Sequence, residues 1–549
     1  MKAKFLLSLV VAAIISSCSG PSPGAEIIPS EAETVMSFNL KSLYEKAKLD
    51  ELGDNNMLSV FEEEVKNESQ EFYDFYQRVK EDPLSTGIDL REDIYLFQIP
   101  GERKSFAMSL SVYDREDFEN TLNTFKTFIR KMEGKKVLEN VKEGKKDGYS
   151  YWSYDETHLA YNDDAAIIMV KPKTDGQKSK ENAKDNGIDK LMTSEPEDNL
   201  VSQEPFEEFV NEASDVNFYV SSNLLKDYMN MASQLTDDPS IDQTLKSNRD
   251  MWENNSMSAH MTFKEDEVDV SCNLKYNEKL QNYLDDFTLS TGEVDKEMIS
   301  YFDAENIMVA SISVNMKEYY GYLKESGQLE TLKGLMGGFN EEFDIDRFMK
   351  GLNGNMILAL KSIEEKEVQK KYSWNDKTYT TTKTMPKGGL VIGLNDKAYF
   401  ESLFNKYLPD STEIKNGLRI VEENDQQFFI SLKENSLMIS TVEDQALKHK
   451  NGEAYENSLL DSRMADRLAD YPVYCSLKLS SSDLHLNPKT FVGQRTKSRM
   501  KIWDAMVERL EYRQKDINNF SLTMYMNDGG ENSLHRLVKF GNEAYKSAM

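Results

Sequence analysis

Apolar and polar residues alternate over several short stretches of the chain, and each such stretch predicts a half-buried β-strand. The clearest lie at residues 35–40, 93–99, 105–112, 149–154 and 165–170. Apolar residues at helical spacing follow the first and the third of them. Strands in adjacent pairs, mixed with helices, favour an α+β fold with antiparallel sheets over a doubly wound parallel sheet.

The same order of elements recurs in the second half of the chain. Asn39 and Asn315 each end an alternating stretch and precede a helical stretch that carries tyrosine, while Asp114 and Asp396 each separate a strand-like stretch from a helical one. Aspartate is a preferred N-cap residue of helices. We therefore expect equivalent strand-to-helix positions for the two asparagines and a helix cap at each aspartate.

This repetition predicts a tandem duplication of one α+β fold rather than an array of short solenoid repeats. The expected halves are residues 31–292 and 293–549. Each half would be an antiparallel sheet with helices packed on it.

Two polar segments show neither the alternation that predicts strands nor the apolar spacing that predicts helices. Residues 19–30 are rich in Ser, Gly and Pro, which predicts a flexible tether. Residues 173–200 are polar and carry no aromatic residue, which predicts a mobile loop within the first half. A switch or partner-binding segment is the alternative interpretation of this loop.

The N-terminus has a different pattern. Lys2 and Lys4 precede an apolar run that is too short to span a membrane as a stable helix, and small residues then lead to Cys18. Residues 1–18 resemble a bacterial lipoprotein signal peptide with its lipobox. The resemblance implies cleavage before Cys18 and a lipid on that cysteine; an uncleaved anchor, or a leader that ends in a cysteine by chance, is the alternative.

The composition excludes some classes of partner. The chain has 66 Lys and Arg against 95 Asp and Glu, and its net charge is −29. This charge would repel nucleic-acid phosphates and anionic lipid headgroups, so nucleic-acid binding is not expected. A lipid anchor needs no basic surface, because its acyl chains hold the protein.

Two further cysteines, Cys272 and Cys475, each lie in a strand-like stretch. The cell envelope is oxidising, so one disulfide between them is possible. Buried free thiols are common in strands, and we favour two unpaired cysteines.

No motif points to catalysis, a metal or a cofactor. No two of the five histidines lie within four residues of each other, and the H-E-x-x-H, P-loop, dinucleotide and EF-hand patterns are missing. A G-x-S-x-G match at residues 20–24 contains two prolines and follows no strand, so it is no hydrolase elbow. His260 is interpreted as a strand residue, with a general base as the alternative.

An aromatic strip is the best candidate for an interaction surface. Tyr149, Tyr151, Trp152 and Tyr154 fall in one predicted strand, where Tyr149 and Tyr151 share one face and Trp152 and Tyr154 the other. One face is expected to meet the core, and the other could contact a partner. Acidic runs elsewhere are interpreted as solvated faces, although paired carboxylates could also serve a glycosidase.

The whole mature chain resembles a family of uncharacterised lipoproteins from Gram-negative anaerobes, domain of unknown function 4836. The resemblance rests on the lipobox at Cys18, the opening IPSEAETVMSFNLKSL, and the strand-Asp-helix unit at Asp114 and Asp396. It implies no known activity and no catalytic residue.

Together these features predict a lipid-anchored envelope protein that acts by binding or scaffolding, without enzyme activity. We expect it at the outer membrane facing the periplasm, with an envelope protein or a glycan as its partner. The alternative is an envelope hydrolase that acts on glycan or peptide through an unrecognised carboxylate site.

Overall fold

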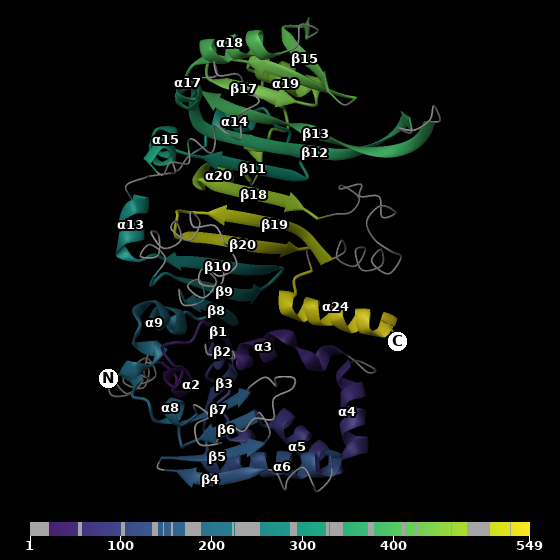
Figure 1. Cartoon of the computed structure of the whole chain (residues 1–549). Helices are drawn as coiled ribbons and strands as arrows, with labels where there is room; N and C mark the ends of the chain where they lie inside the picture. The colour runs from purple at the N-terminus through teal and green to yellow at the C-terminus, as the bar shows by residue number, and fades with distance from the viewer. Residues whose placement is uncertain are drawn as a thin grey trace, which may run out of the picture. The chain divides into compact units, whose positions relative to one another are not determined.

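The computed structural model describes most of the chain, and Figure 1 traces its course. It describes residues 21–548 apart from segments 53–56, 100–104, 134–140, 147, 155–156, 171–187, 222–223, 225–252, 286–293, 326–328, 330–343, 372–377, 409–411, 424, 463, 480–505 and 528. Residues 1–18, the predicted signal peptide with Cys18, therefore lie outside the described residues. In the part that is described, no helix is long and apolar enough to cross a membrane.

The chain forms two compact units. Unit 1 comprises Met1–Lys264, Cys272–Asn277 and Glu531–Met549, and unit 2 comprises Glu265–Ser271 and Glu278–Gly530. This division differs from the predicted halves, because the C-terminal segment returns to unit 1. There, His535 makes a hydrogen bond through Nδ1 to the carbonyl oxygen of Ala47 at 2.7 Å.

Unit 1 contains one antiparallel sheet with the strand order β4-β5-β6-β7-β3-β2-β1-β8-β9. Alternating burial along these strands gives the sheet a core face, as the sequence pattern predicts. The strands are β1 (Thr34–Phe38), β2 (Ile94–Ile99), β3 (Ser105–Ser111), β4 (Lys142–Lys146), β5 (Tyr149–Tyr154), β6 (Thr157–Tyr161), β7 (Ala165–Val170), β8 (Val216–Ser221) and β9 (Ser256–Lys264).

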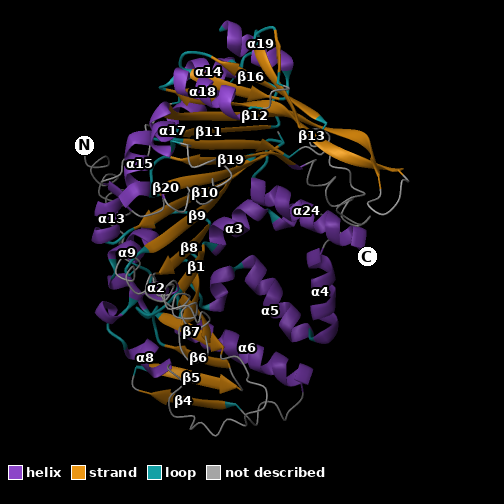
Figure 2. Cartoon of the chain, turned by 45° about the horizontal axis from the view of Figure 1, so that its top comes forward, coloured by secondary structure: helices purple, strands orange, loops and turns teal. Residues whose placement is uncertain are grey.

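Helices lie on both sides of this sheet. Figure 2 shows α2, α8 and α9 on one side and α4, α5 and α6 on the other. The helices are α2 (Pro23–Glu26), α3 (Leu40–Ala47), α4 (Met57–Glu68), α5 (Gln70–Glu81), α6 (Arg115–Glu133), α8 (Ile188–Thr193), α9 (Glu204–Asn211) and α24 (Ser533–Ala548). Short 3-10 helices are η1 (Leu49–Leu52), η2 (Pro83–Thr86), η3 (Pro196–Asp198) and η4 (Leu200–Ser202).

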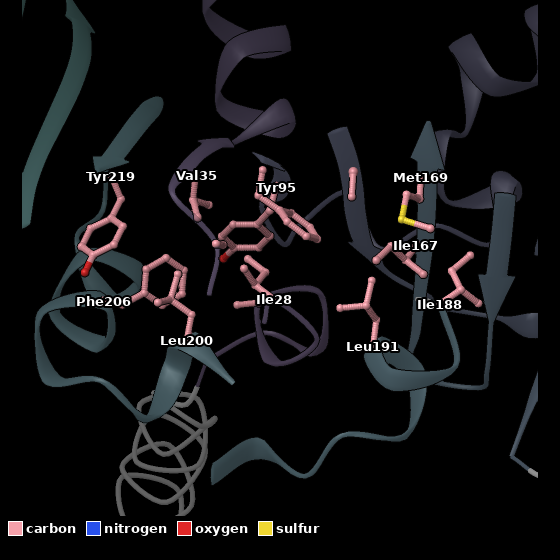
Figure 3. Close-up of a cluster of buried hydrophobic side chains, with 14 of the residues drawn as sticks. Ile28, Val35, Tyr95, Ile167, Met169, Ile188, Leu191, Leu200, Phe206 and Tyr219 are labelled. Atoms are coloured by element: carbon pink, nitrogen blue, oxygen red, sulfur yellow. The ribbon is translucent and has the colours of Figure 1, made fainter. Parts of the chain in front are cut away.

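The main core of unit 1 fills the space between the sheet and the α2, α8 and α9 side (Figure 3). Val35 and Tyr95 from the strands meet Ile28, Leu200 and Phe206 from the covering segments, and all five are buried. Burial of such side chains contributes roughly 1.5–3 kcal/mol each. This core explains why the covering segments are ordered.

Both predicted polar segments are therefore corrected in part. The predicted tether, residues 19–30, enters the core through Ala25 and Ile28, which are both 0% exposed. Gly24 donates its N–H to Ser111 Oγ at 3.2 Å and accepts a bond from Ser109 Oγ at 2.6 Å, which fixes α2 to β3. Apolar contacts thus outweigh the Ser, Gly and Pro content.

The second correction concerns the predicted mobile loop, residues 173–200. Its first part, up to residue 187, lies outside the described residues. Its last part forms α8 and η3, and Ile188 and Leu191 are buried in the main core. The few apolar residues of this polar segment suffice to dock it.

The strands of unit 2 also pair antiparallel, in the order β14-β15-β16-β17-β13-β12-β11-β18-β19-β20. Its strands are β11 (Met308–Ser313), β12 (Leu352–Lys371), β13 (Thr378–Leu394), β14 (Glu413–Lys415), β15 (Leu418–Glu423), β16 (Gln426–Leu432), β17 (Ser436–Ser440), β18 (Val473–Lys478), β19 (Val507–Gln514) and β20 (Asn519–Met526). The remaining strand, β10 (Glu267–Lys275), has residues in both units.

The first nine strands of unit 2 follow one another across the sheet in the same order as the nine of unit 1. The helices of unit 2 are α13 (Glu278–Asp285), α14 (Lys296–Ser300), α15 (Met316–Glu325), α17 (Ile345–Gly351), α18 (Lys397–Tyr407), α19 (Glu443–Asn451) and α20 (Met464–Asp470), with the 3-10 helix η5 (Leu459–Asp461). The α+β class with antiparallel sheets is confirmed. The origin of the two units in a tandem duplication stays a prediction, which a superposition of their backbones tests.

The predicted helix caps are confirmed. Asp114 Oδ1 accepts the N–H of Asp117 at 2.9 Å at the start of α6, and Asp396 Oδ1 accepts the N–H of Tyr399 at 2.9 Å at the start of α18. Asn39 likewise caps α3, and Asn315 accepts a bond from the first turn of α15. Each cap satisfies an N–H group that has no partner within its helix.

Candidate functional site

A polar cavity of about 470 Å³ opens in unit 1 where β1 gives way to α3. Strands β2 and β8 flank β1 and run antiparallel to it, so both begin at the end where β1 stops. Asp93 directly precedes β2 and Asp215 directly precedes β8. The topology thus brings two aspartates that are far apart in the sequence to one end of the sheet.

Helix α3 is fixed over this end by its first turn. Its N-cap Asn39 donates its backbone N–H to the carbonyl oxygen of Asp215 at 3.0 Å, and its side chain accepts the N–H of Ser42 at 2.9 Å. Lys46, one turn further along, therefore points back to the start of β8.

The Asp215 carboxylate is saturated with donors. Lys46 Nζ reaches both oxygens at 2.7 Å, Ser42 Oγ donates to Oδ1 at 2.5 Å, and the N–H of Phe263 donates to Oδ2 at 2.6 Å. The Asp215 side chain is only 2% exposed. A buried carboxylate that accepts four hydrogen bonds from three groups is a structural clamp between α3, β8 and β9.

The electrostatic environment of Asp93 differs from that of Asp215. Burial raises the pKa of its carboxyl group, and hydrogen bonds from Ser37 and Asn39 only partly oppose that rise. Ser37 Oγ donates to Asp93 Oδ2 at 2.8 Å. The pKa of the neighbouring Glu92 is also raised, by burial and by the negative charges of Asp89 and Asp93. These carboxyl groups therefore hold protons more tightly than usual.

A chain of hydrogen bonds leads from Asp93 into the sheet. Asn217 Nδ2 donates to Ser37 Oγ at 2.9 Å, and Asn217 Oδ1 lies 2.7 Å from His260 Nδ1. Burial lowers the pKa of His260, which keeps the ring neutral, so Nδ1 carries the proton in this contact. His260 is the strand residue of β9 that we expected, and it supports Asp93 through two intermediates.

The cavity has more negative than positive groups. Lys46 and Arg91 line it together with the carboxyl groups of Glu92, Asp93, Glu212 and Asp215. Both cations are already paired, Lys46 with Asp215 and Arg91 with Asp89 at 2.7 Å. Amides and hydroxyls from residues such as Asn39, Asn211, Ser22 and Thr262 complete the lining.

This arrangement is suited to a ligand that donates hydrogen bonds or carries positive charge. An ammonium group near Asp93 and Glu92 would lower their raised pKa values and gain a charge-assisted hydrogen bond. Among the described residues, no group of three or more His, Cys, Asp and Glu side chains is placed to hold a metal ion.

The predicted aromatic strip lies on β5, and one of its four residues is buried. Tyr149 is 4% exposed and donates its hydroxyl hydrogen bond to Asp189, while Tyr151 packs against the main core. Trp152 packs on the opposite face, against a cluster around Phe118, and lies 6.4 Å from the ring of Tyr154. The alternation of faces is found as predicted, and Tyr151, Trp152 and Tyr154 are half-buried. An interaction surface at this strip stays a prediction.

The structure describes two of the three cysteines. Cys18 lies outside the described residues. Cys272 and Cys475 are free thiols, and burial raises the pKa of both.

Sequence reasoning did not identify Asp93, Asp215 or Lys46. The available signal was an aspartate directly before each of two strands, REDIYLFQI and ASDVNFYV. It becomes informative only once β2 and β8 are known to flank β1.

The comparisons with known proteins identify the family. The sequence profile of the domain of unknown function DUF4836 matches residues 25–534, so the chain belongs to this family. No curated protein matches the chain. Crystal forms I and III of TP0453 are similar at 12% identity, with TM-scores of 0.23 and 0.24. They cover 48% and 51% of this chain and 83% and 91% of their own, and similarity this weak carries no argument about function.

Proposed function

We propose that this protein is a lipid-anchored envelope protein that binds a polar, amine-bearing ligand in the cavity beside α3. Cys18 would carry the lipid, at the outer membrane on the periplasmic side. The partner would be an envelope protein or glycan that offers ammonium and hydroxyl groups. The observation that carries the proposal is the excess of carboxyl groups in a cavity whose two cations are already paired.

The burial and the hydrogen bonds of Asp215 favour binding over catalysis. A hydrolase with two carboxylates needs both of them to reach the substrate. The oxygens of Asp215 are occupied by Lys46, Ser42 and Phe263 and are buried, so this residue supports neither a nucleophile nor a base. One observation favours the hydrolase alternative, since the raised pKa of Asp93 would suit a general acid.

A photocrosslinking experiment in intact cells tests the proposal. Glu212 lines the cavity and is exposed, so a photoreactive amino acid can replace it without disturbing the core. Glu207, exposed on α9 and not part of the cavity lining, is the matched control position. We expect a discrete adduct of an envelope component at position 212 and none at 207. The same adduct at both positions, or none at 212, would contradict the proposal.

A further inference from the structure

Three cations and one buried carboxylate form a cluster in unit 2. The cations are Arg467 on α20, Lys478 at the end of β18 and Arg509 on β19. The carboxylate is that of Glu511, also on β19. Strands β18, β19 and β20 pair in this order and lie side by side in Figure 1, so the cluster belongs to one sheet and the helix α20 that contacts it.

Glu511 joins the two arginines. Its side chain is 0% exposed, Oε2 accepts a hydrogen bond from Arg467 Nη1 at 2.5 Å, and Oε1 lies 3.1 Å from Arg509 Nε. A buried carboxylate needs such partners, because taking its charge out of water without them is costly. One arginine compensates that charge, so the second one leaves a positive charge in excess.

Lys478 adds a further positive charge beside Arg509. The two residues lie directly opposite each other in the antiparallel pairing of β18 with β19. Side chains in such positions have Cβ atoms about 4.5–5.5 Å apart, and like charges there are destabilising. Among the described residues, no carboxylate forms an ion pair with Lys478. Three positive charges therefore meet one negative charge here, in a chain whose net charge is −29.

The two guanidinium groups are fixed and still have unused donors. Arg509 lies over the ring of Tyr525, with Cζ 4.5 Å from the ring centroid, and Arg467 Nη1 donates to the Tyr525 hydroxyl at 3.1 Å. In the described part of the chain, Nη1 and Nη2 of Arg509 and Nη2 of Arg467 make no hydrogen bond. The two side chains are 20% and 35% exposed, respectively. Guanidinium groups held in this way are suited to bidentate binding of an anion.

The excess of positive charge indicates a doubly charged anion. A phosphate group on a single ester bond carries a charge of about −1.5 to −2 at pH 7 and has three strong acceptor oxygens. A carboxylate has one charge and two oxygens, which is less than two arginines and a lysine can bind. A nucleic acid fits poorly, because its row of phosphates would meet the negative field of the remaining chain.

We propose that Arg467, Lys478 and Arg509 bind a dianionic phosphate group. The arginines would donate to two of its oxygens and Lys478 to the third, and the anion would relieve the repulsion between Lys478 and Arg509. The contacts with Glu511 also fix α20 to β19, but that role requires neither a second arginine nor Lys478. The cavity in unit 1 attracts cations instead, so either proposal can fail without the other.

The test is isothermal titration calorimetry with the full-length protein in detergent, in a buffer without phosphate. The probe is phenyl phosphate, and benzoate, a carboxylate on the same ring, is the control ligand. We expect saturable binding of phenyl phosphate and binding of benzoate that is at least about tenfold weaker, because benzoate offers fewer charge-assisted hydrogen bonds.

Lys478→Gln is the deciding variant, because Lys478 makes no contact with Glu511. It should bind phenyl phosphate at least about tenfold more weakly, since a hydrogen bond to a charged group is lost. In urea unfolding without ligand it should be at least as stable as the wild-type protein, because a like-charged pair is removed. Lys515→Gln removes an exposed lysine just beyond the other end of β19 and is the matched control, which should bind like the wild-type protein. Arg467→Lys keeps the charge but loses the planar fork, and it should bind more weakly.

Two further ligands distinguish the sources of the phosphate group. Inorganic phosphate that binds as tightly as phenyl phosphate would identify free phosphate, and sedimentation with phosphatidic acid vesicles that depends on Lys478 would identify a lipid headgroup. Both results would support the proposal. Equal binding of benzoate, wild-type binding by Lys478→Gln, an equal loss of binding in Lys478→Gln and Lys515→Gln, or no binding of either phosphate compound would overturn it.

Discussion

The ammonium group of Lys46 lies 2.7 Å from both carboxylate oxygens of Asp215, which is 169 residues away in the sequence. This pair joins the first helix of unit 1 to the start of β8. It also neutralises the one lysine of the cavity, so the remaining carboxyl groups determine what the cavity attracts.

Replacing Asp215 by Asn should destabilise unit 1. The amide cannot accept all four hydrogen bonds, and the buried N–H of Phe263 and the Lys46 ammonium lose a charged partner. An unsatisfied buried donor costs about 1–3 kcal/mol. We expect a fall of that size in the unfolding free energy, measured by urea denaturation. Glu207→Gln on the exposed face of α9 is the control, and an equal effect of both changes would contradict the clamp.

His449 should make unit 2 sensitive to acid. It is 0% exposed and its ring nitrogens contact Ser431 and Ser436, with Nε2 at 2.9 Å from Ser436 Oγ. Burial, helped by the charge of Lys433 and opposed by Glu297, lowers its pKa from 6.5 to about 3. As the pH falls, the ring of His449 therefore takes up a proton in the unfolded chain before it does so in the folded protein.

The stability that depends on neutral His449 is complete above pH 6.5 and is lost progressively between pH 6.5 and about 3. The slope for one such group is about 1.4 kcal/mol per pH unit. Between pH 7 and pH 5, the unfolding free energy of the His449→Gln variant should fall by about 2 kcal/mol less than that of the wild-type protein. Parallel pH profiles of the two proteins in urea unfolding would rule this role out.

The two aspartate caps should contribute similar amounts to the free energy of unfolding. Asp114→Ala and Asp396→Ala each remove a side-chain acceptor from a first-turn N–H, which costs about 0.5–2 kcal/mol. Glu401→Ala, an exposed change within α18, controls for helix propensity and should change stability by less. Thermal or urea unfolding provides the measurement. A cap variant no less stable than Glu401→Ala would refute that cap.

The lipid anchor is tested at Cys18. Cys18→Ala should abolish lipidation and leave the protein with an unprocessed leader or in the soluble fraction. Mass spectrometry of the N-terminal peptide and fractionation of cells give the answer. An unmodified Cys18 in the wild-type protein would show that the lipoprotein signal was misread.

The sequence predicts those features of the fold that depend on residues close together in the chain. The strands around Val35 and Tyr95 and the caps at Asp114 and Asp396 follow from alternation and from local hydrogen bonding, and they are found where expected. Such features need only a few consecutive residues, so no tertiary information is required.

Features that depend on distant contacts were missed. Ala25 and Ile28 lie in a segment that looks like a tether, yet a core assembled from other strands buries them. The cavity requires Asp93 and Asp215 to meet at the end of β1, which only the strand order determines. Likewise, only the pairing of β18 with β19 places Lys478 directly opposite Arg509.

The most direct test of the proposed function is calorimetric titration with soluble disaccharide-peptide fragments of peptidoglycan, which carry ammonium and hydroxyl groups. The account predicts saturable binding without cleavage of the fragments. Affinity should rise with pH, because Asp93 and Glu92, whose pKa values are raised, must lose protons to bind an ammonium group. Asp93→Asn should bind at least about tenfold more weakly while remaining as stable as the wild-type protein, since it removes a partly buried charge. Equal binding by this variant, no binding by the wild-type protein, or hydrolysis of the fragments would contradict the account.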